Sequence, residues 1–264
     1  MSAAAAGADD RGRRHAVIDA PGGLTKSVLR RARLALGTLV DIGAGGGIER
    51  AFELLAEIEF ELSGFNPGGD IGRFNQLSGG ETLRVGPHTA AVLAAAHALT
   101  VESRGLFDVA QGTGAWSLHG RELRKDSSSA RIDLGGIGKG YAVDRCFEAL
   151  RAGACWVNAG GDLRVRGIEL PVVLRNERSG GVHPWMVLRE GALATSWFGR
   201  RARSRLSGRV RAAHVSVAAP SCMLADALTK VVARSGRLDH PLLERHGATA
   251  WVHQGTASST PALE

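Results

Sequence analysis

RIDLGGIGKGYAVD, residues 131–144, places three closely spaced glycines and a lysine between a short apolar segment and a segment with helical periodicity. Ile132 and Leu134 flank Asp133 in the pattern of the end of a buried strand. The glycines let the backbone approach a ligand, a helix N-terminus presents free N–H groups, and Lys139 adds a positive charge. The stretch fits a phosphate cradle and, equally well, a tight strand-to-helix turn. It matches neither the Walker loop nor G-x-G-x-x-G.

The composition of this 264-residue chain, with a net charge of +7, is that of a soluble globular protein. Lysine occurs at only four positions, so arginine supplies nearly all of the positive charge and spreads it along the sequence. This distribution argues against a nucleic-acid-binding stripe. The densest group is interpreted as a solvated loop, although it could also meet phosphates or an acidic partner: Arg200, Arg201, Arg203, Arg205, Arg209 and Arg211.

Cysteine spacing and hydropathy indicate a cytoplasmic protein without a membrane span. Cys146, Cys155 and Cys222 are odd in number and lack metal-ligand spacing, which is typical of buried thiols in a reducing compartment. No segment reaches the length of a membrane span, and the charged N-terminus lacks the apolar core of a signal peptide.

Periodicity predicts an α+β fold in which helices and strands occur in separate runs. Residues 1–28 are expected to be a disordered tail, residues 29–256 a single domain, and residues 257–264 a polar tail. Helices are predicted at 47–62, 87–103, after Gly140, from Met223 to Ala233 and near 240–246, with a loop at 63–75. Strands are predicted at 32–42, 130–134, 155–159, 162–166, 170–175, 184–189, 191–195, 213–218 and 249–253.

One further glycine-rich stretch, LVDIGAGGG at 39–47, is similar to the first motif of a Rossmann-type methyltransferase. The next strand of that fold should end in an acidic residue that binds the ribose. The sequence SGFNPGGD occupies this place instead, so a glycine-rich hairpin or strand-to-helix turn is the favoured interpretation.

Five stretches in order resemble the FAD:protein FMN transferase (ApbE) family, and together they span most of residues 32–235. They are ALGTLVDI (35–42); SGFNPGGDIGRFN (63–75); GLFDVAQGTGAW (105–116); RIDLGGIGKGYAVDR (131–145) with WVNAGGDLRVRG (156–167); and GALATS (191–196) with VSVAAPSCMLADALTK (215–230). The resemblance implies two lobes built from mixed or antiparallel sheets with flanking helices, and a flavin cleft between the lobes.

The resemblance also implies an activity. In that family Mg²⁺ lies on the FAD pyrophosphate, a threonine hydroxyl of an acceptor protein attacks the FMN phosphorus, and AMP leaves. A diphosphate needs cations and N–H donors as its P–O bond breaks, and magnesium needs hard oxygen ligands.

By the same resemblance, specific residues of this chain receive roles. The expected FAD contacts are Leu36, Phe65, Leu106, Phe107, Asp108, Asp133 and Lys139, with Phe65 stacking on the isoalloxazine ring. The Gly136 carbonyl and the Asp226 carboxylate are the expected metal ligands, and Asp226 and Lys230 are the expected catalytic residues. Ordinary structural roles compete with these: a loop anchor for Phe65, a turn residue for Asp108 and a solvated helix position for Asp226.

Two departures from the family pattern bear on the mechanism. The family usually reads A-D-A-L-x-T, with the threonine as a second metal ligand, whereas this chain reads A-D-A-L-T-K. Because residues four apart share a helix face, Lys230 rather than Thr229 is expected to point toward the ligand position. Its ammonium could take over part of the metal's role or repel Mg²⁺, and a surface pair with Asp226 is the alternative.

The second departure is the absence of the family's S-H-x-I-D-P-x-T-G segment, whose histidine suits general acid–base work. His214 lies directly before the V-S-V strand, away from the equivalent position. The sequence thus predicts protein flavinylation. A Mg-dependent FAD pyrophosphatase giving FMN and AMP, and a non-catalytic FAD-binding protein, remain alternatives.

Overall fold

A computed structural model describes residues 28–176, 181–199, 202 and 206–253 of the chain. Its centre is a seven-stranded sheet in the order β1-β2-β6-β7-β10-β11-β12, in which neighbouring strands are all antiparallel. The strands are β1 (Leu29–Ala35), β2 (Thr38–Ala44), β6 (Cys155–Ala159), β7 (Asp162–Arg166), β10 (Gly191–Trp197), β11 (His214–Ala219) and β12 (Thr249–Val252).

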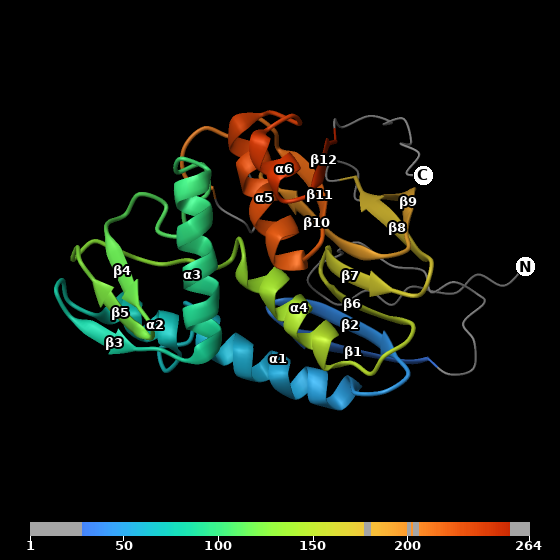
Figure 1. Cartoon of the computed structure of the whole chain (residues 1–264), viewed down its shortest axis with the longest axis horizontal. Helices are drawn as coiled ribbons and strands as arrows, with labels where there is room; N and C mark the ends of the chain where they lie inside the picture. Colours follow the sequence, from blue (N-terminus) through green and yellow to red (C-terminus); the bar gives the residue numbers. More distant parts are fainter. Residues whose placement is uncertain (1–27, 177–180, 200–201, 203–205, 254–264) are drawn as a thin grey trace, which may run out of the picture.

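Three helices cover one face of this sheet (Figure 1): α1 (Ile48–Leu62), α4 (Gly138–Ala149) and α5 (Cys222–Ser235). Alternate residues of β2 and β6, such as Ile42 and Val157, point into the core beneath these helices. The close packing of α4 on α5 requires glycine at position 140, because a Cβ there would lie 2.3 Å from the Cys222 carbonyl oxygen. This contact fixes the helix that carries Asp226 and Lys230.

The hairpin of β8 (Leu170–Arg175) and β9 (Val182–Leu188) packs on the opposite face. Trp156 and Trp185 belong to this second core. The indole of Trp156 lies over Gly43 on the neighbouring strand, where any Cβ would approach within 2.1 Å of the ring. The sheet is therefore covered on both faces at β6, β7 and β10, whereas the edge strand β1 is exposed.

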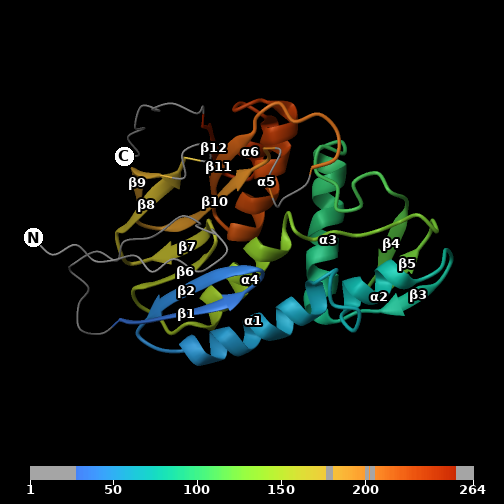
Figure 2. The same cartoon turned by 180° about the vertical axis from the view of Figure 1, so that it is seen from behind.

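A smaller group of elements lies beyond the C-terminal end of α1 (Figure 2). It contains α2 (Asp70–Gln76), α3 (Pro87–Glu102) and the three-stranded sheet β3-β5-β4, formed by β3 (Thr82–Arg84), β4 (Trp116–His119) and β5 (Glu122–Lys125). Its buried residues are continuous with the core under α1 and α4. The short helix α6 (Pro241–Arg245) leads into β12.

The α+β expectation is confirmed, as are the predicted helices at 47–62 and 87–103 and the strands from 155 to 175. The glycine-rich segment 39–47 forms a strand-to-helix turn between β2 and α1, as favoured, and the antiparallel sheet excludes the methyltransferase fold. None of the described helices is long and apolar enough to span a membrane.

Three expectations of secondary structure were wrong. The predicted strand at 32–42 is a hairpin, since Leu36 and Gly37 adopt φ values of 53° and 69° and turn the chain. The predicted loop at 63–75 contains α2. Residues 130–134 form no strand, and the short strands β3, β4 and β5 were not predicted.

The predicted tails at 1–28 and 257–264 lie outside the described residues except for Val28, so the domain boundaries stay a prediction. Arg200, Arg201, Arg203 and Arg205 also lie outside them. The described arginines of that group, Arg209 and Arg211, are exposed and lie in a segment without helix or strand, as a solvated loop would be.

Candidate active site

The glycine-rich stretch 131–144 leads from an extended segment into α4. Ile132 and Leu134 are buried, but the backbone of Ile132 pairs with a side chain instead of a strand. Asn75 Oδ1 accepts from the Ile132 N–H at 2.8 Å, and Asn75 Nδ2 donates to the Ile132 carbonyl at 3.0 Å. The side chain of α2 thus replaces a neighbouring strand, and Lys139 follows in the first turn of α4.

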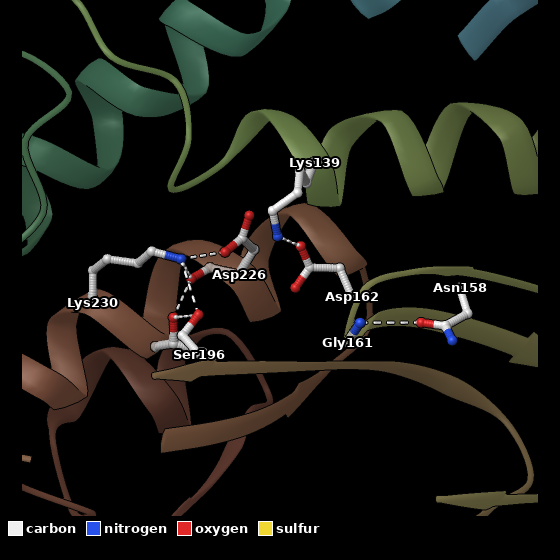
Figure 3. A network of polar contacts seen from close by, with 8 residues as sticks. Lys139, Asn158, Gly161, Asp162, Ser196, Asp226 and Lys230 are labelled. Atoms are coloured by element: carbon white, nitrogen blue, oxygen red, sulfur yellow. Dashed lines mark hydrogen bonds and ion pairs between the residues drawn. The ribbon is translucent and has the colours of Figure 1, made fainter. Parts of the chain in front are cut away.

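Lys139 reaches across to the end of the central sheet. Its ammonium donates to Asp162 Oδ2, at the first residue of β7 (Figure 3). Gly160 and Gly161, with φ values of 63° and 103°, form the tight turn from β6 into β7, and Asn158 Oδ1 accepts from the Gly161 N–H at 3.2 Å. This turn requires glycine and places the Asp162 carboxylate toward α4.

A second ion pair lies beside the first, within α5. Asp226 and Lys230 are four residues apart, and the Lys230 ammonium donates to the Asp226 carboxylate. It also donates to the Asp226 backbone carbonyl at 3.0 Å and to Ser196 Oγ on β10 at 3.3 Å. Both side chains are buried, which excludes a solvated surface pair.

These two pairs act on each other electrostatically. Burial, together with the negative charge of Asp226, raises the pKa of Asp162 to about 6, although Lys139 opposes the rise. Burial would raise the pKa of Asp226 as well, but Lys230 and then Lys139 hold it below its ordinary value. Burial would lower the pKa of Lys139, but Asp162 and Asp226 raise it above its ordinary value. At neutral pH the two aspartates are therefore ionised.

The cluster keeps two unpaired acceptors. Among the described residues, Asp162 Oδ1 and Asp226 Oδ2 are buried side-chain atoms without a hydrogen-bond partner. Buried carboxylate oxygens are costly to leave unpaired, and such groups concentrate at functional sites. We therefore take the charged cluster of Lys139, Asp162, Asp226 and Lys230 as the candidate active site.

The structure brings together four of the residues singled out from the sequence. Lys230 packs so closely against Gly136 that a Cβ at position 136 would lie 2.9 Å from the Lys230 Cε. The glycine loop, Lys139, Asp226 and Lys230 thus meet although nearly 100 residues separate the two motifs. The Thr229 hydroxyl is bonded to Ser196 Oγ at 3.0 Å and to the Asp226 carbonyl at 2.7 Å.

The other predicted FAD contacts are not in this cluster. Phe65 is fully exposed and Leu36 is half-buried, with its N–H bonded to Glu59 at 2.8 Å. Asp133 is exposed, and its carboxylate accepts from the Gly135 N–H at 2.8 Å.

The Leu106–Asp108 segment has structural roles in this state. Leu106 is half-buried, and the Phe107 ring is buried in the core. Both oxygens of the Asp108 carboxylate accept turn N–H groups, from Ala110 and Gly112, each at 2.8 Å. The FAD-binding roles of these residues stay predictions.

Sequence reasoning did not assign Asp162 or Ser196, although both lie in motifs that it used. The signal for Asp162 was its position after the two glycines of NAGGD. A hairpin turn there places the next side chain at the beginning of the following strand. Ser196 follows from the strand register alone, so the sequence carried no separate signal for it.

The cluster suits Mg²⁺ poorly. Asp226 Oδ2 is a free hard oxygen, but the Lys230 ammonium is already bonded to the other oxygen of the Asp226 carboxylate, and the aliphatic part of the Lys230 side chain lies against Gly136. An ion ligated by both predicted metal ligands at about 2.1 Å would lie next to a fixed positive charge. In the described part of the chain no group of three or more His, Cys, Asp and Glu side chains could hold a metal ion.

An antiparallel α+β fold with a buried cluster of lysines and aspartates at a glycine-rich helix start defines a candidate phosphate-handling enzyme. Comparison with protein families makes the assignment specific, since the model of the ApbE family matches residues 36–122 and 112–249. The chain belongs to the ApbE family.

Solved structures with the same fold include two that are named flavin or flavinyl transferases. The flavin transferase ApbE from Vibrio cholerae is 20% identical, with a TM-score of 0.65 over 78% of this chain and 86% of that one. The flavinyl transferase ApbE of Pseudomonas stutzeri is 20% identical, with a TM-score of 0.68 over 86% and 92%. The apbe protein of Thermotoga maritima is 20% identical, with a TM-score of 0.69 over 85% and 94%. No curated protein sequence matches the chain.

Proposed function

We propose that this protein transfers the FMN part of FAD to a threonine hydroxyl of an acceptor protein and releases AMP. One observation carries the proposal. The glycine loop before α4, the NAGGD turn and the start of α5 are distant in sequence, yet they meet in one cluster with two ammonium groups, in which Lys139 is half-buried and Asp162, Asp226 and Lys230 are buried. Flavin transfer by the family and by the solved neighbours supplies the reaction class.

The reaction that we propose breaks the P–O bond between the FMN phosphorus and the bridging oxygen of the diphosphate. The threonine oxygen forms the new bond to that phosphorus, its proton passes to solvent, and the bridging oxygen leaves as part of the AMP phosphate. Negative charge develops on the phosphate oxygens during this step, and fixed cations stabilise it. Lys139 and Lys230 are the cations that the cluster offers, and Asp162 and Asp226 hold them in place.

The flavin end of FAD requires an apolar surface. Phe65 is the aromatic side chain that we assign to the isoalloxazine ring, because its ring is fully exposed and free to stack. Leu36, Leu106, Phe107, Asp108 and Asp133 remain proposed FAD contacts. The threonine acceptor and the cytoplasmic location likewise stay predictions. The metal role of Gly136 and Asp226 and Mg²⁺ dependence were expected from the resemblance, but we leave them out of the proposal because the Lys230 ammonium pairs with the Asp226 carboxylate.

The test is to incubate the purified protein with FAD and with a lysate of cells that express the chain. Transfer requires AMP release and flavin fluorescence that stays on a protein band in a denaturing gel. Asp226→Ala should abolish both signals, whereas Glu148→Ala, at an exposed position of α4, should leave them unchanged. Free FMN and AMP without a labelled protein would identify a pyrophosphatase, and FAD binding without AMP would identify a flavin binder.

A further inference from the structure

The position of the Lys230 ammonium suggests a function beyond an ion pair. A lysine ammonium has three N–H donors, and here three oxygens surround it: the Asp226 carboxylate, the Asp226 carbonyl and Ser196 Oγ. The residue is only 5% exposed, so its long side chain is held in one place. Figure 3 shows these contacts beside the Lys139–Asp162 pair.

This place coincides with the position at which the sequence predicts a divalent cation. The expected ligands of that cation are the Gly136 carbonyl and the Asp226 carboxylate. Lys230 contacts both residues, because it bonds to the Asp226 carboxylate and its Cε lies against Gly136. The ammonium is itself a cation surrounded by oxygens, to which it donates hydrogen bonds. It is part of a side chain of the protein, so no ion has to bind from solution.

The charges of the cluster lead to the same conclusion. Two lysines and two aspartates cancel, so the buried cluster is neutral without any ion. With a threonine at position 230 the same cluster would carry a charge of −1. A buried negative charge is costly and attracts a cation, and a divalent cation there would bring the cluster to +1. Lys230 supplies a positive charge at this place without any ion and disfavours a second cation beside it.

We propose that the Lys230 ammonium replaces the divalent cation at the diphosphate of FAD, so that this chain binds FAD without metal. The proposal rests on the proposed function, since it assigns the FAD diphosphate to this site. A structural ion pair would also be buried and bonded, but it would not make nucleotide binding independent of metal. Metal dependence of binding therefore separates the two roles.

The experiment measures FAD binding by fluorescence titration, in EDTA and in excess Mg²⁺, on metal-stripped protein. The wild-type dissociation constants in the two buffers are expected to agree within about twofold. Lys230→Thr should weaken binding in EDTA at least tenfold and recover it in Mg²⁺, because it restores an oxygen ligand and frees Asp226. Lys230→Met should lose binding in both buffers.

Two further measurements provide controls. Mn²⁺ electron paramagnetic resonance should detect a bound ion in Lys230→Thr and none in the wild type, independently of FAD. Lys125→Met removes another buried lysine, on β5 and bonded to the Asn75 carbonyl, and should leave binding metal-independent.

The outcomes separate the two proposals. Wild-type binding that falls tenfold in EDTA, or a Mn²⁺ ion bound to the wild type, would overturn the role of Lys230 and leave the proposed function standing. A Lys230→Thr protein that folds but gains no metal dependence would also overturn it. No FAD binding by the wild type in either buffer would overturn the proposed function and this proposal together.

Discussion

Replacing Asp144 by alanine is expected to destabilise the protein strongly, because this side chain of α4 caps the N-terminus of α5. Its two carboxylate oxygens accept from the Cys222 and Met223 N–H groups, each at 2.9 Å. Asp144 Oδ1 also accepts from Arg164 Nη1 at 2.7 Å. Asp144 is 4% exposed, so water cannot replace these bonds. The helix that carries Asp226 and Lys230 therefore depends on a carboxylate from another helix.

The size of the effect follows from the bonds that are lost. Each backbone N–H left without an acceptor costs about 1–3 kcal/mol. The Arg164 guanidinium remains partly exposed and lies 3.8 Å from Glu148, so losing its pair adds about 1 kcal/mol or less. We expect Asp144→Ala to lower the free energy of unfolding by about 2–7 kcal/mol. For a domain of this size that corresponds to a fall in Tm of roughly 4–28 °C.

Urea denaturation followed by circular dichroism measures this change directly. Asp144→Asn keeps one acceptor oxygen and should lose about half as much stability as the alanine variant. Glu148→Ala is the matched control, because it removes an exposed carboxylate near the same arginine and should change stability by less than about 0.5 kcal/mol. Ser221, the N-cap residue of α5, accepts only the Leu224 N–H, so it cannot replace Asp144. If Asp144→Ala lost less than about 1 kcal/mol, the bonds of Asp144 to the start of α5 would not stabilise this helix.

Further predictions concern acid stability, helix packing and flavin binding. Burial and neighbouring histidines lower the pKa of His214 and of His253 to about 4. The unfolded chain therefore binds more protons between pH 6.5 and 4, and stability should fall as the pH drops through this range, by up to about 1.4 kcal/mol per pH unit for each histidine. Urea unfolding of His253→Gln should show a flatter dependence, and an equal slope would contradict this assignment. Gly140→Ala should lower the free energy of unfolding by about 1–3 kcal/mol, since its Cβ would lie 2.3 Å from a backbone carbonyl of α5. Gly138→Ala is the control in the same unfolding assay. Its Cβ would meet its nearest atom at 3.5 Å, so stability should not change. Phe65→Ala should raise the Kd for FAD by about 2- to 13-fold at unchanged Tm, because stacking contributes about 0.5–1.5 kcal/mol. An unaltered Kd would show that Phe65 does not contact the flavin.

Local patterns in the sequence determined the long helices. The apolar face of α1, which includes Leu55 and Ile58, repeats with helical spacing, and burial of that face is what stabilises such a helix. The glycine-rich stretches were equally informative, because tight turns such as Gly160–Gly161 admit few other residues. Family membership followed from the order and spacing of these motifs.

Long-range contacts decided what the sequence could not. Residues 130–134 alternate like a strand, yet their backbone bonds to the Asn75 and Thr113 side chains and to the Val109 carbonyl, which no local pattern reveals. A turn at Leu36 and Gly37 divides the predicted strand 32–42 into β1 and β2. The sequence did not reveal this turn, because the apolar pattern continues through it.

The candidate site shows the same division between sequence and structure. The spacing of Asp226 and Lys230 on one helix placed them on a common face, and the sequence was sufficient for that. Only the folded chain decides that this face meets Gly136, that Asp162 and Lys139 lie beside it, and that the cluster is buried. The physical reason is that burial and electrostatic coupling depend on the packing of α4 and α5 on the sheet, and such packing is a property of the whole fold.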